Sequence, residues 1–230
     1  MKTLAFGILV MGGCAALAKD TPEDLKKIAD SVQRAAFAED PEHPLERVEV
    51  SAIEGETGIY VAIRDTQPRW WGDFICFKYD RGRIEWVAGS SAVAEQSILE
   101  VRGFKLPGFS WPFVEVFGTT HMGNGSCYLY ELRDNALRLV LQTRAVDSHA
   151  SDLNVIRGGR LTANYRELDG DGRPDVEFLG VVDEYSDDGH ETLLRSTPCR
   201  KVFLWDRRSN RFVEDRAQRK GFESYSVLEH

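Results

Sequence analysis

Short segments in which apolar and polar side chains alternate recur along the chain from residue 47 onward. Alternation with a period of two is typical of a strand with one face on a core and the other in solvent. Charged or glycine-bearing turns such as Asp80–Gly82 and Gly123–Gly125 separate the segments. The chain is therefore predicted to be mostly β. The expected strands are Arg47–Ile53, Ile59–Ile63, Phe74–Tyr79, Arg83–Val87, Phe113–Phe117, Cys127–Leu132, Leu137–Leu141, Asp175–Leu179, Lys201–Trp205 and Arg211–Glu214.

These segments fall into three similar units, each reading strand, loop, strand, charged turn, strand. Repeated antiparallel units of this kind indicate blade-like repeats, in a propeller-like arrangement or a curled meander. A sandwich or an irregular barrel is the alternative, because any all-β domain contains hairpins that resemble one another. Residues 91–101 fit either a strand or a helical turn.

Residues 20–38 carry the one clear helical pattern in the sequence. Thr21 is a suitable N-cap and Pro22 suits the first turn. The apolar residues recur at helical spacing, which predicts a helix that packs on the sheet. They are Leu25, Ile28, Ala29, Val32 and Ala36.

The first 18 residues have the organisation of a secretory signal peptide. Lys2 supplies the positive start, and the apolar run that follows is far shorter than the ~20 residues of a membrane span. Ala16-Leu17-Ala18 is a good cleavage site. Met11-Gly12-Gly13-Cys14 offers a rival, in which Cys14 becomes a lipidated N-terminus. Both routes predict export, to the bacterial periplasm or the outer-membrane face.

The rest of the chain is expected to divide into an N-terminal helical segment, a β domain and a short C-terminal remnant. Residues 19–44 hold the helix and an acidic linker, and residues 45–227 form the β domain. Residues 228–230 look like the start of a purification tag. No other segment of the sequence is apolar enough to be expected to cross a membrane.

The formal net charge is −8, without basic clusters. Such a chain is not expected to bind nucleic acid or an anionic membrane surface. Its charge instead suits a cation site or a basic partner.

Three cysteines lie beyond the signal segment, at positions 76, 127 and 199. Export makes one disulfide plausible, and Cys76 with Cys127 is the first pairing expected because both begin apolar strands. Three buried, unpaired thiols are the alternative.

The stretch Glu167–Asp175 places acidic side chains at alternate positions of a glycine-bearing loop. Calcium takes about six to eight oxygen ligands, and a short loop supplies them from its first, third, fifth, seventh and ninth positions. Gly172, in sixth place, allows the sharp turn such a loop needs. The predicted ligands of a structural Ca²⁺ are Glu167, Asp169, Asp171, the Arg173 carbonyl and Asp175.

A helix–loop–helix calcium site is excluded, because its twelfth position would be Phe178. The nine-residue form resembles the calcium loops of FG-GAP and integrin-like repeats. The resemblance covers this loop and the strand after it, and departs at Glu167, where those repeats carry Asp. The alternative is a tight acidic turn with solvated carboxylates.

Arg69, Trp70 and Trp71 form a second candidate site, in a loop between two expected strands. Paired tryptophans beside an arginine are typical of binding hot spots. They are equally typical of aromatic residues that reach the core from a loop.

A calcium loop in a blade-like β protein behind a signal peptide resembles the calcium-binding, propeller-type immunity proteins of the periplasm. That resemblance implies a non-catalytic inhibitor of a cell-wall-degrading effector, with a basic secreted hydrolase as partner and loops such as Arg69–Asp73 at the interface. The alternatives are a secreted hydrolase with a structural calcium and a structural module of an envelope complex.

Overall fold

The computed structural model describes residues 27, 48–54, 59–65, 74–80, 83–88, 97–119, 124–151, 155–186 and 192–221. The expected signal segment with Cys14 and the predicted partner-binding residues Arg69, Trp70 and Trp71 lie outside these residues. So does the helix expected over residues 20–38, apart from Lys27, which is helical and exposed.

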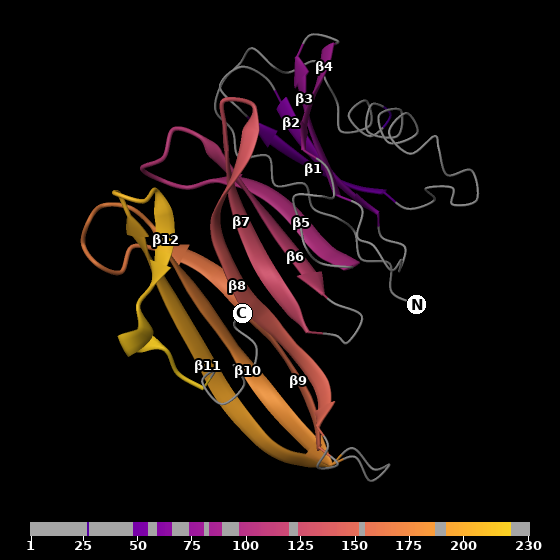
Figure 1. Ribbon diagram of the computed structural model, residues 1–230, viewed down its shortest axis with the longest axis vertical. Coiled ribbons are helices and arrows are strands. Elements are labelled where there is room, and N and C mark those ends of the chain that lie inside the picture. The colour runs from indigo at the N-terminus through magenta and orange to yellow at the C-terminus, as the bar shows by residue number, and fades with distance from the viewer. Residues whose placement is uncertain are drawn as a thin grey trace.

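The larger of two antiparallel sheets has eight strands, arranged in chain order from β5 at one edge to β12 at the other (Figure 1). Each strand is hydrogen-bonded to the strands that precede and follow it, so this sheet is a meander. Its strands are β5 (Ser97–Lys105), β6 (Pro112–Thr119), β7 (Gly125–Arg133), β8 (Ala136–Ser151), β9 (Val155–Arg166), β10 (Asp175–Ser186), β11 (Leu193–Asp206) and β12 (Arg211–Glu214).

The smaller sheet is a four-stranded meander. It consists of β1 (Val48–Glu54), β2 (Ile59–Asp65), β3 (Phe74–Asp80) and β4 (Arg83–Ala88). A short 3₁₀ turn, η2 (Arg216–Gln218), follows β12, and Lys220 then pairs with Arg200 of β11.

Turn chemistry fixes the tight connections of the larger sheet. Between β7 and β8, Asp134 and Asn135 have φ of +53° and +55°. Asn and Asp tolerate this left-handed region better than other side chains, and two such residues in succession make the turn that suits a hairpin. Asn210, with φ of +50°, also adopts the left-handed conformation, in the turn between β11 and β12.

Opposite faces of the larger sheet bury two different clusters. Cys76 of β3 packs with Val114 and Val116 of β6 and with Tyr128 and Tyr130 of β7. This cluster joins the small sheet to one face of the large one. Because alternate residues of a strand point to opposite faces, Phe113 and Phe117 lie in the other cluster.

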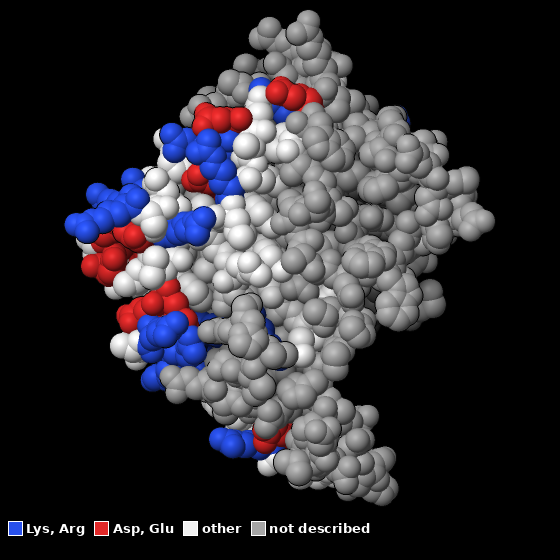
Figure 2. All heavy atoms as spheres, in the orientation of Figure 1, with Lys and Arg blue, Asp and Glu red and all other residues white. Residues whose placement is uncertain are grey.

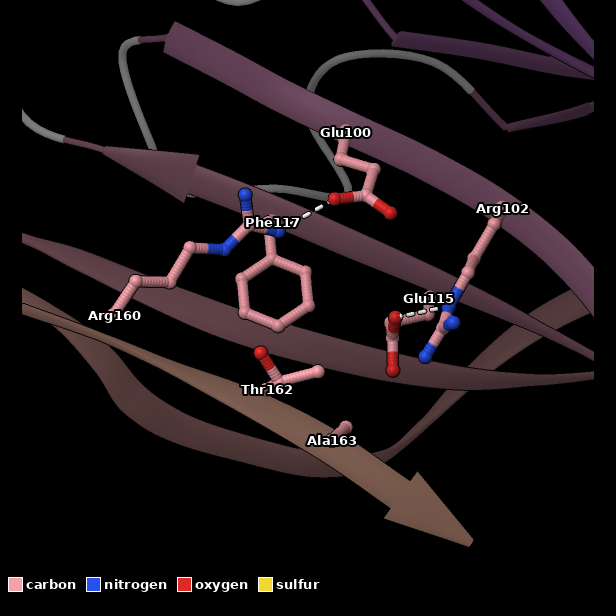
Figure 3. A pocket seen from close by; sticks show the side chains of 7 residues that line it. All are labelled: Glu100, Arg102, Glu115, Phe117, Arg160, Thr162 and Ala163. Atoms are coloured by element: carbon pink, nitrogen blue, oxygen red, sulfur yellow. Dashed lines mark hydrogen bonds and ion pairs between the residues drawn. The ribbon is translucent and has the colours of Figure 1, made fainter. Parts of the chain in front are cut away.

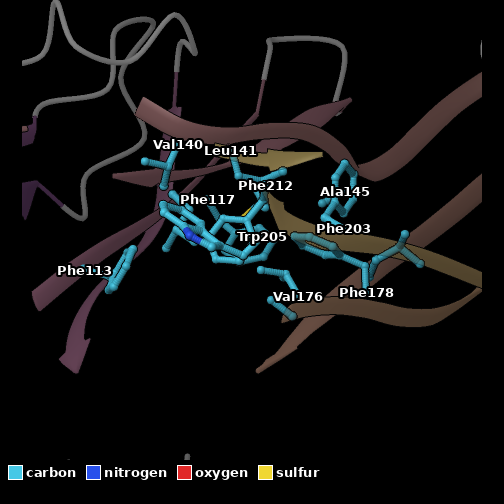
Figure 4. Packing of buried hydrophobic residues seen from close by; sticks show 14 of the residues in the cluster. Phe113, Phe117, Val140, Leu141, Ala145, Val176, Phe178, Phe203, Trp205 and Phe212 are labelled. Carbon is cyan, nitrogen blue, oxygen red and sulfur yellow. The ribbon is translucent and has the colours of Figure 1, made fainter. Parts of the chain in front are cut away.

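The second cluster is the main core, and it draws side chains from β6 through β12 (Figure 4). Trp205 stands at its centre, with edge-to-face ring contacts to Phe109 and Phe212, both at 4.9 Å between centroids. Strands at opposite ends of the chain order can share this core only if the sheet rolls over on itself.

The roll is made where β8 and β9 diverge. β8 pairs with β9 only through Val146–Ser151 and Val155–Arg160, whereas its earlier residues pair with β7. Beyond Arg160, β9 continues along β10 alone. Gly159 sits at the junction, where an added Cβ would come within 2.5 Å of the Val181 carbonyl oxygen, so no larger residue fits.

The prediction of a mostly β, antiparallel chain is confirmed, and each of the ten expected strands falls on an observed one. Ser97–Val101, left open between strand and helix, belongs to β5. Blade-like repetition stays a prediction. Within the described residues, no helix is long and apolar enough to span a membrane.

The expected Cys76–Cys127 disulfide is not formed in the structure. Cys76 and Cys127 are buried thiols, and Cys199 is a third buried cysteine outside any disulfide in the described part of the chain. Cys76 belongs to the cluster between the sheets and Cys127 to the main core, so the body of the large sheet separates them. The starts of two apolar strands therefore gave no information about which faces their cysteines would take.

Candidate functional site

The acidic loop Glu167–Asp175 connects β9 to β10. Gly170 and Gly172 both adopt φ of +82°, a conformation that other residues rarely take, and these two glycines let the chain reverse direction. The sharp turn expected at Gly172 is present, and Gly170 adopts the same backbone conformation two residues earlier.

Loop carboxylates accept hydrogen bonds from loop amides. The amide of Asp171 donates to Asp169 Oδ1 at 3.0 Å, and the amide of Arg173 donates to Asp171 Oδ1 at 2.8 Å. Glu167 Oε1 accepts from the amide of Gly172 at 2.9 Å. These contacts give the loop a defined shape from its own side chains.

Asp175 anchors the loop to the sheet and is fully buried. Its Oδ2 accepts from the amide of Leu168 at 2.9 Å, and its Oδ1 accepts from the amide of Trp205 on β11 at 3.0 Å. Burial raises the pKa of Asp175. The two hydrogen bonds lower this pKa, and the negative charges of Asp169 and Asp171 raise it further.

Arg207, in the turn after β11, lies against the fifth position of the loop. Its Nη2 donates to the backbone carbonyl of Asp171 at 2.9 Å and to Asp171 Oδ2 at 3.2 Å. A guanidinium thus already neutralises part of the loop's negative charge.

The hydrogen bonding of the acidic loop bears on whether it can hold calcium. Within the residues that the structure describes, no three His, Cys, Asp or Glu side chains are arranged so that they could hold a metal ion. The carboxylates of Asp171 and Asp175 face amides and Arg207 instead of a common centre. Calcium binding by this loop stays a prediction, and it requires these side chains to turn inward.

A second polar cluster, which was not predicted from the sequence, lines a cavity between β5, β6 and β9 (Figure 3). Glu115 of β6 is buried to 1 % exposure and accepts hydrogen bonds from Arg102 Nε at 2.5 Å and from the Tyr165 hydroxyl. Burial and the neighbouring Glu115 raise the pKa of Tyr165 well above its usual value, so the phenol remains a proton donor.

The mouth of the cavity carries another ion pair, between Arg160 Nη2 of β9 and Glu100 Oε2 of β5. Arg160 also stacks over the ring of Phe117, with 4.4 Å between its guanidinium carbon and the ring centroid. The pairing of β5 with β6 shifts register between Ile98 and Glu100, and such bulges re-aim side chains.

One signal for this cluster was present in the sequence. Glu115 stands between Val114 and Val116 in a strand that is otherwise apolar on both faces. A charge in such a strand requires a buried partner. The partners, Arg102 and Tyr165, lie 13 and 50 residues away along the chain, and no local sequence pattern predicts them.

Comparison with protein-family models, with curated proteins and with solved structures gave no match.

Proposed function

We propose that this protein is an exported, non-catalytic protein-binding module in which the loop Glu167–Asp175 takes up calcium as a structural ion. The observation that carries the proposal is the gathering of like charge. Burial raises the pKa of Asp175, and the negative charges of Asp169 and Asp171 in the same loop raise this pKa further. A divalent cation at the loop relieves this repulsion, and hard carboxylate and carbonyl oxygens are the ligands calcium prefers.

The loop is positioned so that an ion there would matter to the whole sheet. Asp175 is at once the last residue of the loop and the first of β10, and it holds the amide of Trp205 at the centre of the main core. Fixing the loop therefore fixes the alignment of β10 with β11. Binding free energy then contributes to folding free energy.

Calorimetric titration of Ca²⁺ into chelator-treated protein, with thermal melts in Ca²⁺ and in chelator, tests the proposal. We expect heat of binding and a rise in melting temperature, both lost in Asp169→Asn. The matched control is Asp134→Asn, which removes one carboxylate from an exposed turn whose positive φ suits Asn. An unchanged melting temperature and no heat in the wild type would sink the calcium proposal.

The β10–β11 hairpin supports the protein-binding part of the proposal. Leu179, Val181, Leu193 and Leu194 are between 41 % and 56 % exposed. Several large apolar side chains exposed on one hairpin are typical of an interaction surface. On the face shown in Figure 2, acidic and basic side chains interleave along one margin of the molecule.

By its resemblance to propeller-type immunity proteins, the partner we propose is a basic, cell-wall-degrading hydrolase. Purified hydrolases of this class are assayed with and without the protein, in Ca²⁺ and in chelator. We expect inhibition that the double variant Leu193→Ser, Leu194→Ser abolishes. The control is Leu139→Ser. Leu139 is also partly exposed, but it lies on β8 and not on the hairpin. Inhibition that survives in the double variant would exclude this hairpin as the contact surface.

A further inference from the structure

The cavity between β5, β6 and β9 is a candidate site for a small ligand, separate from the calcium loop. Its volume is about 250 Å³. Pockets for drug-sized ligands measure roughly 300–1,000 Å³, so a molecule of about amino-acid size is what this cavity suits.

Two arginines stand on different sides of the cavity, Arg160 on β9 and Arg102 on β5 (Figure 3). Arg160 is bonded to Glu100 through Nη2, and Arg102 is bonded to Glu115 through Nε. A guanidinium has five N–H donors, so each arginine keeps donors for a ligand. Paired donors of this kind match the two oxygens of a carboxylate.

These guanidiniums are held in place before a ligand arrives. Arg160 lies over Phe117, and Arg102 lies 5.4 Å from the Phe104 ring centroid. Glu115 is itself fixed by Tyr165, so it acts on the cavity by positioning Arg102. Pre-organised donors reduce the entropy lost on binding.

The cavity also offers oxygen acceptors. Glu100 uses Oε2 for Arg160, and within the described residues its Oε1 takes part in no other ion pair or hydrogen bond. Figure 3 shows this second oxygen directed away from Arg160, toward the Arg102 side of the cavity. The hydroxyl-bearing Thr162 lines the cavity from β9.

Charge balance narrows the ligand class. The lining holds two arginines and two glutamates, so it is neutral as a whole. A polyanion such as a phosphate ester would meet two carboxylates, and a simple cation would meet two guanidiniums. A zwitterion pairs both kinds of group and brings no net charge.

We propose that this cavity binds a free α-amino acid. Arg102 and Arg160 bind its carboxylate, Glu100 Oε1 accepts from its ammonium group, and Thr162 contributes a hydroxyl beside them. Nothing in this assignment involves residues 167–175, so it stands whether or not the loop binds calcium.

The test is a titration of the full chain, kept in chelator, with the standard L-amino acids and D-alanine, followed by calorimetry and by melting temperature. Acetate and ethylamine serve as half-ligand probes. We expect at least one amino acid to bind at micromolar to millimolar concentration, and acetate and ethylamine to bind at least tenfold more weakly.

Arg160→Gln and Glu100→Gln should each weaken that binding at least tenfold. Both side chains are more than 40 % exposed, so the variants should fold, and circular dichroism verifies this. Arg138→Gln is the matched control, because Arg138 is an exposed arginine paired with Asp134 on the same sheet. Thr162→Val gives an additional variant that leaves the ion pairs intact, with a smaller loss expected.

Three results would overturn the proposal. The first is no binding by any amino acid at millimolar concentration. The second is acetate binding as tightly as the amino acids, which would remove the role of Glu100. The third is equal affinity in the wild type and in Arg160→Gln.

Discussion

Arg207 Nη2 contacts Asp171 twice, at the backbone carbonyl and at the carboxylate, and so places a cation beside the fifth position of the acidic loop. The same loop residue also accepts from the amide of Arg173. Asp171 is therefore where a guanidinium and a calcium ion would compete.

Replacing Arg207 by Gln should strengthen calcium binding, because Asp171 Oδ2 is released for the ion. We expect affinity to rise about threefold to tenfold in calorimetric titration. In chelator the same variant should lose no more than about 1 kcal/mol of stability, since the Arg207 side chain is largely exposed. Arg208→Gln, at the next position in the turn, is the control. Weaker calcium binding in Arg207→Gln would show that the arginine supports the ion site instead.

Asp175→Ala should destabilise the protein more than any other single change in the loop. Truncation leaves the amides of Leu168 and Trp205 without their acceptor, and each unsatisfied buried donor costs about 1–3 kcal/mol. We expect a loss of about 3 kcal/mol in urea unfolding. Asp169→Ala, which removes an exposed carboxylate with one local hydrogen bond, should cost far less.

The raised pKa of Asp175 predicts a pH dependence of a definite sign. The Asp175 carboxyl binds its proton more tightly in the folded state than in the unfolded chain, where its pKa is near 3.8. The stabilisation is therefore fully present below pH 3.8 and is lost as pH rises through the higher, folded pKa. In unfolding titrations across this range, the stability of the wild type minus that of Asp175→Asn should increase as pH falls. A pH-independent difference would contradict the shift.

The strands were predictable because apolar alternation and turn residues are local. Phe113–Phe117, Cys127–Leu132 and Leu137–Leu141 lie within β6, β7 and β8. β9 was missed, because Gly158 and Gly159 interrupt its apolar pattern. The close approach of β10 explains the glycine at position 159, and this close approach is a tertiary requirement.

The spacing of the acidic residues was enough to locate the loop. The hydrogen-bond partners of its carboxylates could not be predicted from that spacing. Arg207 lies 36 residues from Asp171 and reaches it only because β10, β11 and the turn after β11 fold back. The cavity was missed for the same reason. Glu100 and Arg160 lie 60 residues apart and meet only where β9 leaves β8.

The three described cysteines should react slowly with thiol reagents in the folded protein. All three are buried, and burial raises the pKa of Cys76 to about 12 and the pKa of Cys127 well above 9.0. The thiolate is the reactive form, so both remain protonated at pH 8. Iodoacetamide labelling with mass-spectrometric mapping should find them unmodified in buffer and modified in urea. A Cys76–Cys127 disulfide in peptide maps would contradict the structure.

Glu115 should contribute to the stability of the folded protein as well as to the cavity. Glu115→Ala leaves the Arg102 guanidinium and the Tyr165 hydroxyl without their shared acceptor. Because the Arg102 side chain is 43 % exposed and can turn to water, we expect a loss of about 1–3 kcal/mol. Glu115→Gln retains one oxygen acceptor and should cost less.

Tyr165→Phe, which removes only the hydroxyl donor, separates the two contacts of Glu115, and a double-mutant cycle with Glu115→Gln measures their coupling. If Glu115→Ala and Glu115→Gln proved equally mild in urea unfolding, the buried network would have no stabilising role. The positioning of Arg102 would then have to come from its aromatic neighbours alone.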